Sequence, residues 1–396
     1  MPIDRAGTAR ETFATALRLG LTSFGGPVAH LGYFERTYVR RLHWLGAQDY
    51  AGIVALCQLL PGPTSSQVGF LIGLRRAGWG GALAAWLGFT LPSALLMYLA
   101  ARYASHLHDA LAQSVLHGLK LAAVAVVAQA VWSLARMLCP DLRRATIAVI
   151  CGLLALALSG TPFQALVLAV GAEAGVIFCS RIPVPALPMG RSGSMRDGWL
   201  GLGLFVLLLA LLTGLAAAFP QGLTALCATF YRAGSLVFGG GHVVLPLLHN
   251  TLVSQHWLSE DRFLSGYGLA QALPGPLFTV AAFFGTASAP PHLGALWALA
   301  ATLAIFLPGL LLAVAGHSLW NYTARHPAVR AAITGTNAAV VGLLAAALYD
   351  PVWSSSISTA ADAATAFAAL LLLAGRWKLP PILVVALCVG LALVGA

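Results

Sequence analysis

The residues best suited to chemistry lie around Pro61-Gly62-Pro63, a group that interrupts an apolar stretch. Proline removes a backbone donor and glycine lets the chain change direction, so a helix must break here. Thr64, Ser65 and Ser66 then begin a new helix, whose first amide groups lack partners within that helix. These amides, the positive end of the helix dipole and the short hydroxyl groups predict a cradle for an oxyanion.

The same group recurs as Pro274-Gly275-Pro276, at an offset of 274 − 61 = 213 residues. Gln58 and Gln271 precede the two groups by the same number of residues. A lone break would serve as a packing kink, but paired breaks at matching repeat positions favour a transport site. The second copy continues with Leu277, Phe278 and Thr279. We therefore expect the first copy to supply more of the direct ligands.

A second motif also occurs twice, as Phe24-Gly25-Gly26 and Phe238-Gly239-Gly240, at an offset of 238 − 24 = 214. Its glycines predict either a second pair of oxyanion cradles or only close packing between helices. Both interpretations stay open from the sequence.

Ionisable residues are scarce within the apolar stretches. Arg18 and Arg232 are related by 232 − 18 = 214, the repeat offset. Two guanidinium groups could grip a tetrahedral dianion from both sides, or both side chains could snorkel to the membrane interface. Lys120 matches Asn337 by position and is either a third ligand or a snorkelling lysine.

Motifs for catalysis and cofactor binding are missing from the sequence. The 11 histidines form no H-E-x-x-H pair, and neither a G-x-S-x-G elbow nor a phosphate loop is present. The six cysteines show no C-x-x-C spacing, and we interpret His30, His242 and His249 as packing residues. We expect no catalytic residues, no metal site and no cofactor.

The composition places these motifs in a bilayer. Of 396 residues, 59% are hydrophobic and only 9% are charged, against roughly a quarter charged in a soluble domain. The net charge of +10 is dispersed at the ends of apolar stretches, which argues against nucleic-acid binding. Lipid is therefore the expected surroundings of an all-α polytopic membrane protein.

Apolar periodicity predicts about 13 transmembrane helices arranged as two repeats. The first repeat covers 1–180, a polar linker with a connecting helix covers 181–222, and the second repeat covers 223–396. An odd number of crossings separates equivalent points, so the repeats should have inverted topology. The predicted spans are 12–32, 50–73, 81–103, 113–137, 144–159, 162–179, 199–219, 224–248, 263–287, 292–318, 329–350, 358–374 and 380–396.

Loop charges predict a cytoplasmic N-terminus and a periplasmic C-terminus. Arg75, Arg143 and Arg191 then lie on the cytoplasmic side. The loop with Arg36, Arg40 and Arg41 lies outside, contrary to the preference of basic residues for the cytoplasm. Either that segment is a local amphipathic helix, or span 50–73 is a re-entrant hairpin. We favour the full crossing.

Taken in order, these motifs resemble the chromate ion transporter family in its long, two-domain form. The resemblance rests on Phe24-Gly25-Gly26-Pro27 with His30, on Pro61-Gly62-Pro63-Thr64, and on the second copies from Phe238 to His242 and from Gln271 to Thr279. It implies export of chromate from the cytoplasm across the bacterial inner membrane, which confers chromate resistance.

Membrane potential favours that direction, because expelling a dianion gains about 2.3 kcal/mol per charge per 100 mV. Glu173 and Asp362 are the only acidic residues that we expect within spans, so proton coupling stays open. Sulfate, another tetrahedral dianion, is the alternative substrate, and an anion channel is the alternative mechanism. A homodimer is possible.

Overall fold

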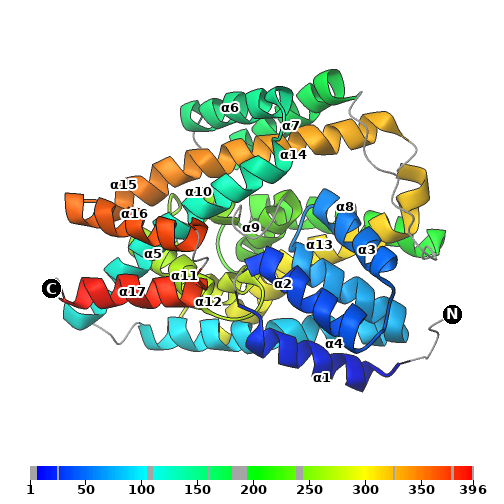
Figure 1. Cartoon of the computed structure of the whole chain (residues 1–396), viewed down its shortest axis with the longest axis horizontal. Coiled ribbons are helices and arrows are strands. Elements are labelled where there is room, and N and C mark those ends of the chain that lie inside the picture. Colours follow the sequence, from blue (N-terminus) through cyan, green and yellow to red (C-terminus); the bar gives the residue numbers. More distant parts are fainter. Residues whose placement is uncertain are drawn as a thin grey trace.

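The structure is a computed structural model, and it describes residues 7–24, 26–104, 110–158, 161–180, 194–237, 244–323, 326–375 and 379–394. These residues form helices and no strand, which confirms the all-α fold class. Five of the described helical segments are long and apolar enough to cross a membrane. The chain is therefore a multi-pass membrane protein. Most long helices lie roughly along the horizontal axis of Figure 1.

The first half begins with α1 (Ala9–Thr22), α2 (Gly26–Phe34), a π-helical turn η1 (Glu35–Arg41), α3 (Ala47–Leu59) and α4 (Thr64–Ala104). Thr8 caps α1 by accepting a hydrogen bond from the Glu11 amide. Helix α4 is two helices, because Ala77 and Gly78 have non-helical dihedral angles. Gly73 and Gly81 pack backbone to backbone across this turn, so its arms, 64–76 and 79–104, fold against each other.

Helix α3 and the first arm of α4 form a hairpin with Pro61-Gly62-Pro63 at its tip. Asp49, at the beginning of α3, pairs with Arg75, at the end of that arm, at 3.4 Å. Each side of the hairpin has 13 residues, or about 20 Å of helix, which is short of a bilayer core of about 30 Å. The preferred crossing over 50–73 is therefore wrong, and the re-entrant alternative describes the structure.

Residues 9–41 fold back in the same way, with the tip at Ser23. The Gly7 amide donates to the Arg76 carbonyl at 3.1 Å, and the Arg76 guanidinium lies 4.9 Å from the Trp44 ring. Both ends of this first hairpin thus lie at one end of the molecule, and 12–32 is not a crossing. Arg40 and Arg41 come just before Trp44, so this basic loop lies at the same end of the molecule as Arg75 and Arg76.

The first half continues with α5 (Ala110–Leu138), α6 (Leu142–Ala157) and α7 (Thr161–Cys179), and α8 (Met195–Ala218) connects to the second half. The Asp141 side chain caps α6, and Ser194 caps α8. Arg143 donates to the Phe178 carbonyl at 3.0 Å, so α6 begins where α7 ends. Helix α8 has little of its surface buried and lies along the outside of the bundle against α13 (Gly294–Thr323).

The second half repeats this order with two further hairpins. Ser259 caps α11 (Glu260–Ala272), and the Phe263 and Phe284 rings stack with their centroids 4.6 Å apart, on either side of the break at 273–276. The predicted crossing at 263–287 is therefore also a hairpin, and α9 (Leu223–Leu236) packs on α10 (Val244–Leu252), so 224–248 folds back as well. The elements are α9 (Leu223–Leu236), α10 (Val244–Leu252), α11 (Glu260–Ala272), η3 (Leu277–Thr279), α12 (Val280–Ala287), α13 (Gly294–Thr323), α14 (Pro327–Ala347), η4 (Leu348–Trp353), α15 (Ser354–Ser356), α16 (Ala360–Ala374) and α17 (Pro381–Val394).

Two of the seven predicted crossings that separate equivalent points of the two halves are thus hairpins, which leaves 7 − 2 = 5 of them. The number is still odd, so the two halves keep opposite orientations. In Figure 1, α1 begins on the right and α17 ends on the left, so the two ends of the chain lie at opposite ends of the molecule.

The halves interlock instead of standing apart. Helix α5 packs on α16 and α17 of the second half, and α14 packs on α6 and α7 of the first. Small residues permit these contacts: Gly335 meets Gly171 and Gly175, and Gly342 meets Gly152. One buried apolar cluster draws residues from both halves. The division at 181–222 stays a prediction, since neither half has a separate core.

Candidate oxyanion site

The hairpin tips of the two halves bond to each other in the middle of the molecule. The Gly62 amide donates to the Val237 carbonyl at 2.6 Å, and the Gly275 amide donates to the Ser23 carbonyl at 3.0 Å. The bonds are equivalent by the repeat, since 275 − 62 = 213 and 237 − 23 = 214. Each Pro-Gly-Pro group is therefore held by the first hairpin of the other half.

Both central glycines are required by the backbone and by the space around them. Gly62 has φ +122° and Gly275 has φ +98°, in the region that favours glycine. A Cβ atom on Gly62 would lie 2.7 Å from the Gly309 Cα, and one on Gly275 would lie 2.7 Å from the Ser93 Oγ. Gly309 and Ser93 each follow a proline within the long helix of the opposite half.

The first tip is lined by buried polar groups. Thr64, Ser65, Ser66 and Gln67 are at most 5% exposed. Gln67 donates to the carbonyls of Pro61 and Gly309 at 2.8 and 2.9 Å. The Ser66 hydroxyl and the Gln67 Oε1 make no hydrogen bond within the described structure. Buried polar groups rarely stay unpaired, so this cluster calls for a polar ligand or water.

His30 adds a fourth polar side chain to this tip. It is 1% exposed, its Nδ1 lies 3.4 Å from the Ser65 hydroxyl, and its Nε2 is buried without a partner among the described residues. Its ring packs edge-on against Phe89 at 5.3 Å between centroids. Interpreting His30 as a packing residue missed this contact with the first turn after the break.

The second tip is apolar at the equivalent positions. Adding the offset to His30, Thr64, Ser65 and Gln67 leads to Val244, Leu277, Phe278 and Val280, all buried. Thr279 is polar, and its hydroxyl donates to the Pro276 carbonyl at 2.8 Å. The first copy thus carries more polar side chains than the second, and His30 and Gln67 are part of this difference. A residue-by-residue comparison of the repeats was the signal that could have found them.

The other predicted ligands at the breaks occupy varied positions. Gln58 lines a groove between α2 and α3, Gln271 is buried, and Pro274 and Pro276 flank Gly275 at the second tip. Gly26 begins α2 with φ +76°. Gly25, Gly239 and Gly240 lie outside the described residues.

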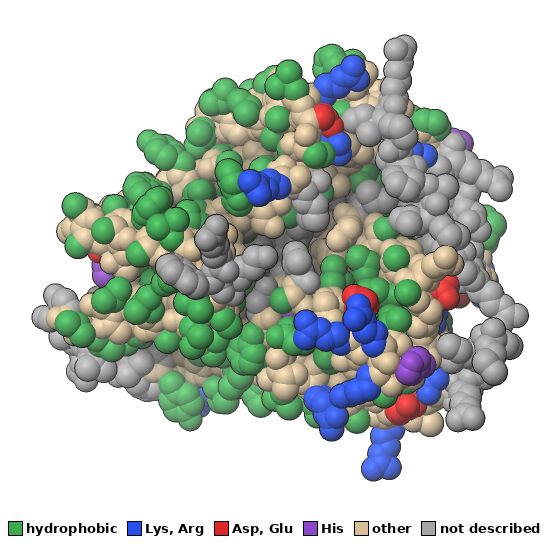
Figure 2. Space-filling model, in the orientation of Figure 1, with side chains coloured by type: hydrophobic (Ala, Val, Ile, Leu, Met, Phe, Trp, Pro, Cys, Tyr) green, Lys and Arg blue, Asp and Glu red, His purple; other side chains and the backbone are tan. Residues whose placement is uncertain are grey.

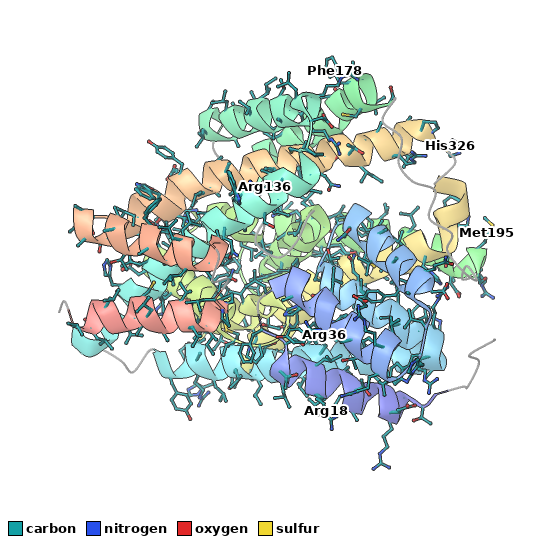
Figure 3. All side chains as sticks on the ribbon, in the orientation of Figure 1. Arg18, Arg36, Arg136, Phe178, Met195 and His326 are labelled. Atoms are coloured by element: carbon teal, nitrogen blue, oxygen red, sulfur yellow. The ribbon has the colours of Figure 1, made fainter. Side chains whose placement is uncertain are left out.

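Arg18 and Arg232, the two members of the predicted clamp, differ in burial. Arg18 is exposed on the outer side of α1 (Figure 3), as the snorkelling alternative expects. Arg232 is partly buried, and its Nε makes no hydrogen bond within the described chain. The repeat offset relates the two positions, but their surroundings differ.

The remaining ionisable candidates have neighbours of their own. Lys120 forms an ion pair with Asp261 at the beginning of α11, away from the breaks. Glu173 is exposed on α7. Asp362 accepts hydrogen bonds from the amides of Ser358 and Thr359 and lies 2.7 Å from the His117 Nε2.

This site offers neutral donors at a helix N-terminus inside a bilayer, an arrangement suited to reversible binding of an anion. Within the described residues no cluster of three His, Cys, Asp or Glu side chains suggests a metal ion. Paired hairpins that meet in the middle of the molecule are typical of transporters built from inverted repeats.

Comparison with known proteins identifies the family. The family described as "Chromate transporter" matches residues 10–176 and 224–395, and the chain belongs to it. It is 28% identical to a chromate transport protein of Pseudomonas aeruginosa, over 96% of this chain and 91% of that protein. It is also 28% identical to a probable chromate transport protein of Synechococcus elongatus, over 94% and 93% of the two chains. No solved structure matches.

Proposed function

We propose that this protein carries chromate out of the cytoplasm across the bacterial inner membrane and thereby confers chromate resistance. The observation that carries the proposal is the polar first tip, where the buried Ser66 hydroxyl makes no hydrogen bond within the described structure and lies at a helix N-terminus whose first amides lack helical partners. The chromate transport proteins to which the chain is similar support chromate as the substrate.

The distribution of charge supports a cytoplasmic N-terminal side and a periplasmic C-terminus. On the face shown in Figure 2, hydrophobic side chains dominate the left half, and Lys and Arg side chains gather in the right half, where α1 begins. Basic residues accumulate on the cytoplasmic side of membrane proteins. With the hairpins in place, Arg40 and Arg41 also follow this rule.

Membrane potential is the proposed driving force. Moving two negative charges outward gains roughly 4–5 kcal/mol at 100 mV. Of the two carboxylates considered for proton coupling, Glu173 is exposed and Asp362 is engaged in capping α16. Both positions favour export driven by potential alone.

Sulfate is a second candidate, because amide and hydroxyl donors recognise the tetrahedral dianion that the two ions share. The test is flux into and out of proteoliposomes under imposed potentials. We expect saturable chromate flux that follows the potential, and counterflow when chromate is present on both sides. Flux without saturation or counterflow would indicate a channel, and sulfate flux that chromate does not inhibit would exclude chromate as the substrate.

A further inference from the structure

A groove runs between the first two hairpins toward the polar tip. Its volume is about 420 Å³, and its lining includes Gly32 and Glu35 from the first hairpin and Ala47, Tyr50, Ala51 and Gln58 from α3. Ala47 begins α3 at the basic end of the molecule, and Gln58 lies three residues before Pro61. The groove therefore runs from that end of the molecule to within about one helical turn of the break.

The equivalent place in the second half is filled. The repeat relates Glu35 to His249 (249 − 35 = 214), Ala47 to Glu260 and Tyr50 to Phe263 (260 − 47 = 263 − 50 = 213). The register is supported by matching backbone bonds, Trp44 to Tyr38 and Trp257 to Leu252, at 2.8 and 2.9 Å.

There the His249 Nε2 lies 3.7 Å from the Glu260 carboxylate and bridges α10 and α11. The His249 ring also packs against Phe263 at 5.3 Å, and Phe263 stacks on Phe284. In the first half, by contrast, Glu35 bonds Arg40 within its own segment, at 2.8 Å, and not the facing helix.

We propose that the groove beside Gln58 is the path by which the transported oxyanion reaches the first tip, and that the His249–Glu260 contact closes the matching path on the other side. Three exposed arginines, Arg36, Arg40 and Arg41, follow Gly32 on the same segment and attract an anion to the mouth; Figure 3 labels Arg36. Transport then exchanges the conformations of the two halves, as inverted repeats permit. This inference rests on the proposed function.

Matched cysteine variants in a cysteine-free background test the inference. Ala51→Cys places a thiol in the groove, and Leu264→Cys places one at the equivalent buried position (264 − 51 = 213). With an impermeant maleimide applied from either side of membrane vesicles, we expect Ala51→Cys to react at least ten-fold faster than Leu264→Cys. Equal rates, or an unreactive thiol at residue 51, would overturn the proposal.

Paired cysteines then test whether the two paths exchange. Under mild oxidation, His249→Cys with Glu260→Cys should cross-link at least ten-fold faster than Glu35→Cys with Ala47→Cys. The first cross-link should abolish chromate flux, and reduction should restore it. Full flux through the oxidised pair, or equal cross-linking of both pairs, would contradict the proposal.

The labelling and cross-linking rates need no substrate. If they match the expectation while chromate flux is missing in the uncross-linked protein, the proposed function fails and the groove assignment stands. If chromate flux is normal and the rates are equal, only the groove assignment fails.

Discussion

At the scale of single residues, the proposed function rests on a difference between two copies of one motif. The backbone at Gly62 and Gly275 is equivalent, but polar His30 and Gln67 lie at one tip and apolar Val244 and Val280 at the other. Motif reading could predict Ser65 and Ser66, because they follow the break directly. It could not predict His30, whose contact with Ser65 joins residues 35 positions apart.

His30 should contribute to binding through its ring nitrogens. We expect His30→Leu to raise the KM for chromate several-fold, since one lost hydrogen bond is worth about 1 kcal/mol. His30→Gln keeps a donor and should stay close to the wild-type value. Flux into proteoliposomes gives the KM of both variants. Equal KM values for His30→Leu and the wild type would mean that His30 is only a packing residue.

The exposed position of Arg18 leads to the opposite expectation for that residue. Arg18→Gln should leave the KM for chromate within two-fold of the wild-type value, because its side chain lies on the outer side of α1. Loss of saturable flux in this variant would support the hypothesis that Arg18 and Arg232 bind the dianion, and it would contradict the placement of the site at the tip.

At the scale of elements, the main difference from the sequence expectation is the hairpin. In the sequence, two 13-residue arms joined by Pro61-Gly62-Pro63 and one broken crossing both appear as an apolar stretch with a break in the middle. Periodicity therefore could not separate the two. The deciding contacts, such as Asp49 with Arg75, join the beginning of one arm to the end of the other. In the sequence, only the basic loop with Arg36, Arg40 and Arg41 indicated a hairpin, because a full crossing placed it outside.

The break itself should be essential to transport. Replacing Pro61 and Pro63 by alanine together removes two constraints against continuous helix and should withdraw the amides of Ser65 and Ser66 from the site. We expect normal membrane insertion and loss of chromate flux. Pro327→Ala is the control, because Pro327 only begins α14. Normal flux in the double variant would make the break a packing feature.

At the scale of the whole molecule, the sequence predicted the all-α fold, the repeat and its inversion, because these depend on composition, offsets and an odd number of crossings. It did not predict that α5 of the first half packs on helices of the second half, or that α14 of the second half packs on helices of the first. This packing between the halves depends on which small residues contact each other, such as Gly335 with Gly171. A single sequence does not show which residues of different spans are in contact.

Topology provides a matched test at this scale. His43 and His256 are exposed equivalents (256 − 43 = 213) in the loops between the two hairpins of each half. We expect His43→Cys to react with an impermeant thiol reagent from the cytoplasmic side, and His256→Cys from the periplasmic side. Labelling of His43→Cys from the periplasm would mean that residues 9–41 cross the membrane.

Binding of radiolabelled chromate to the purified protein tests the central claim, an oxyanion site at the first tip, most directly. The wild type should show one saturable site, and Ser65→Ala combined with Ser66→Ala should bind roughly thirty-fold more weakly, because two hydroxyl donors worth about 1 kcal/mol each are lost. Thr279→Val, at the second tip, should bind as the wild type does. Unchanged affinity in the double variant, or a large loss in Thr279→Val, would contradict the assignment of the site to the first tip.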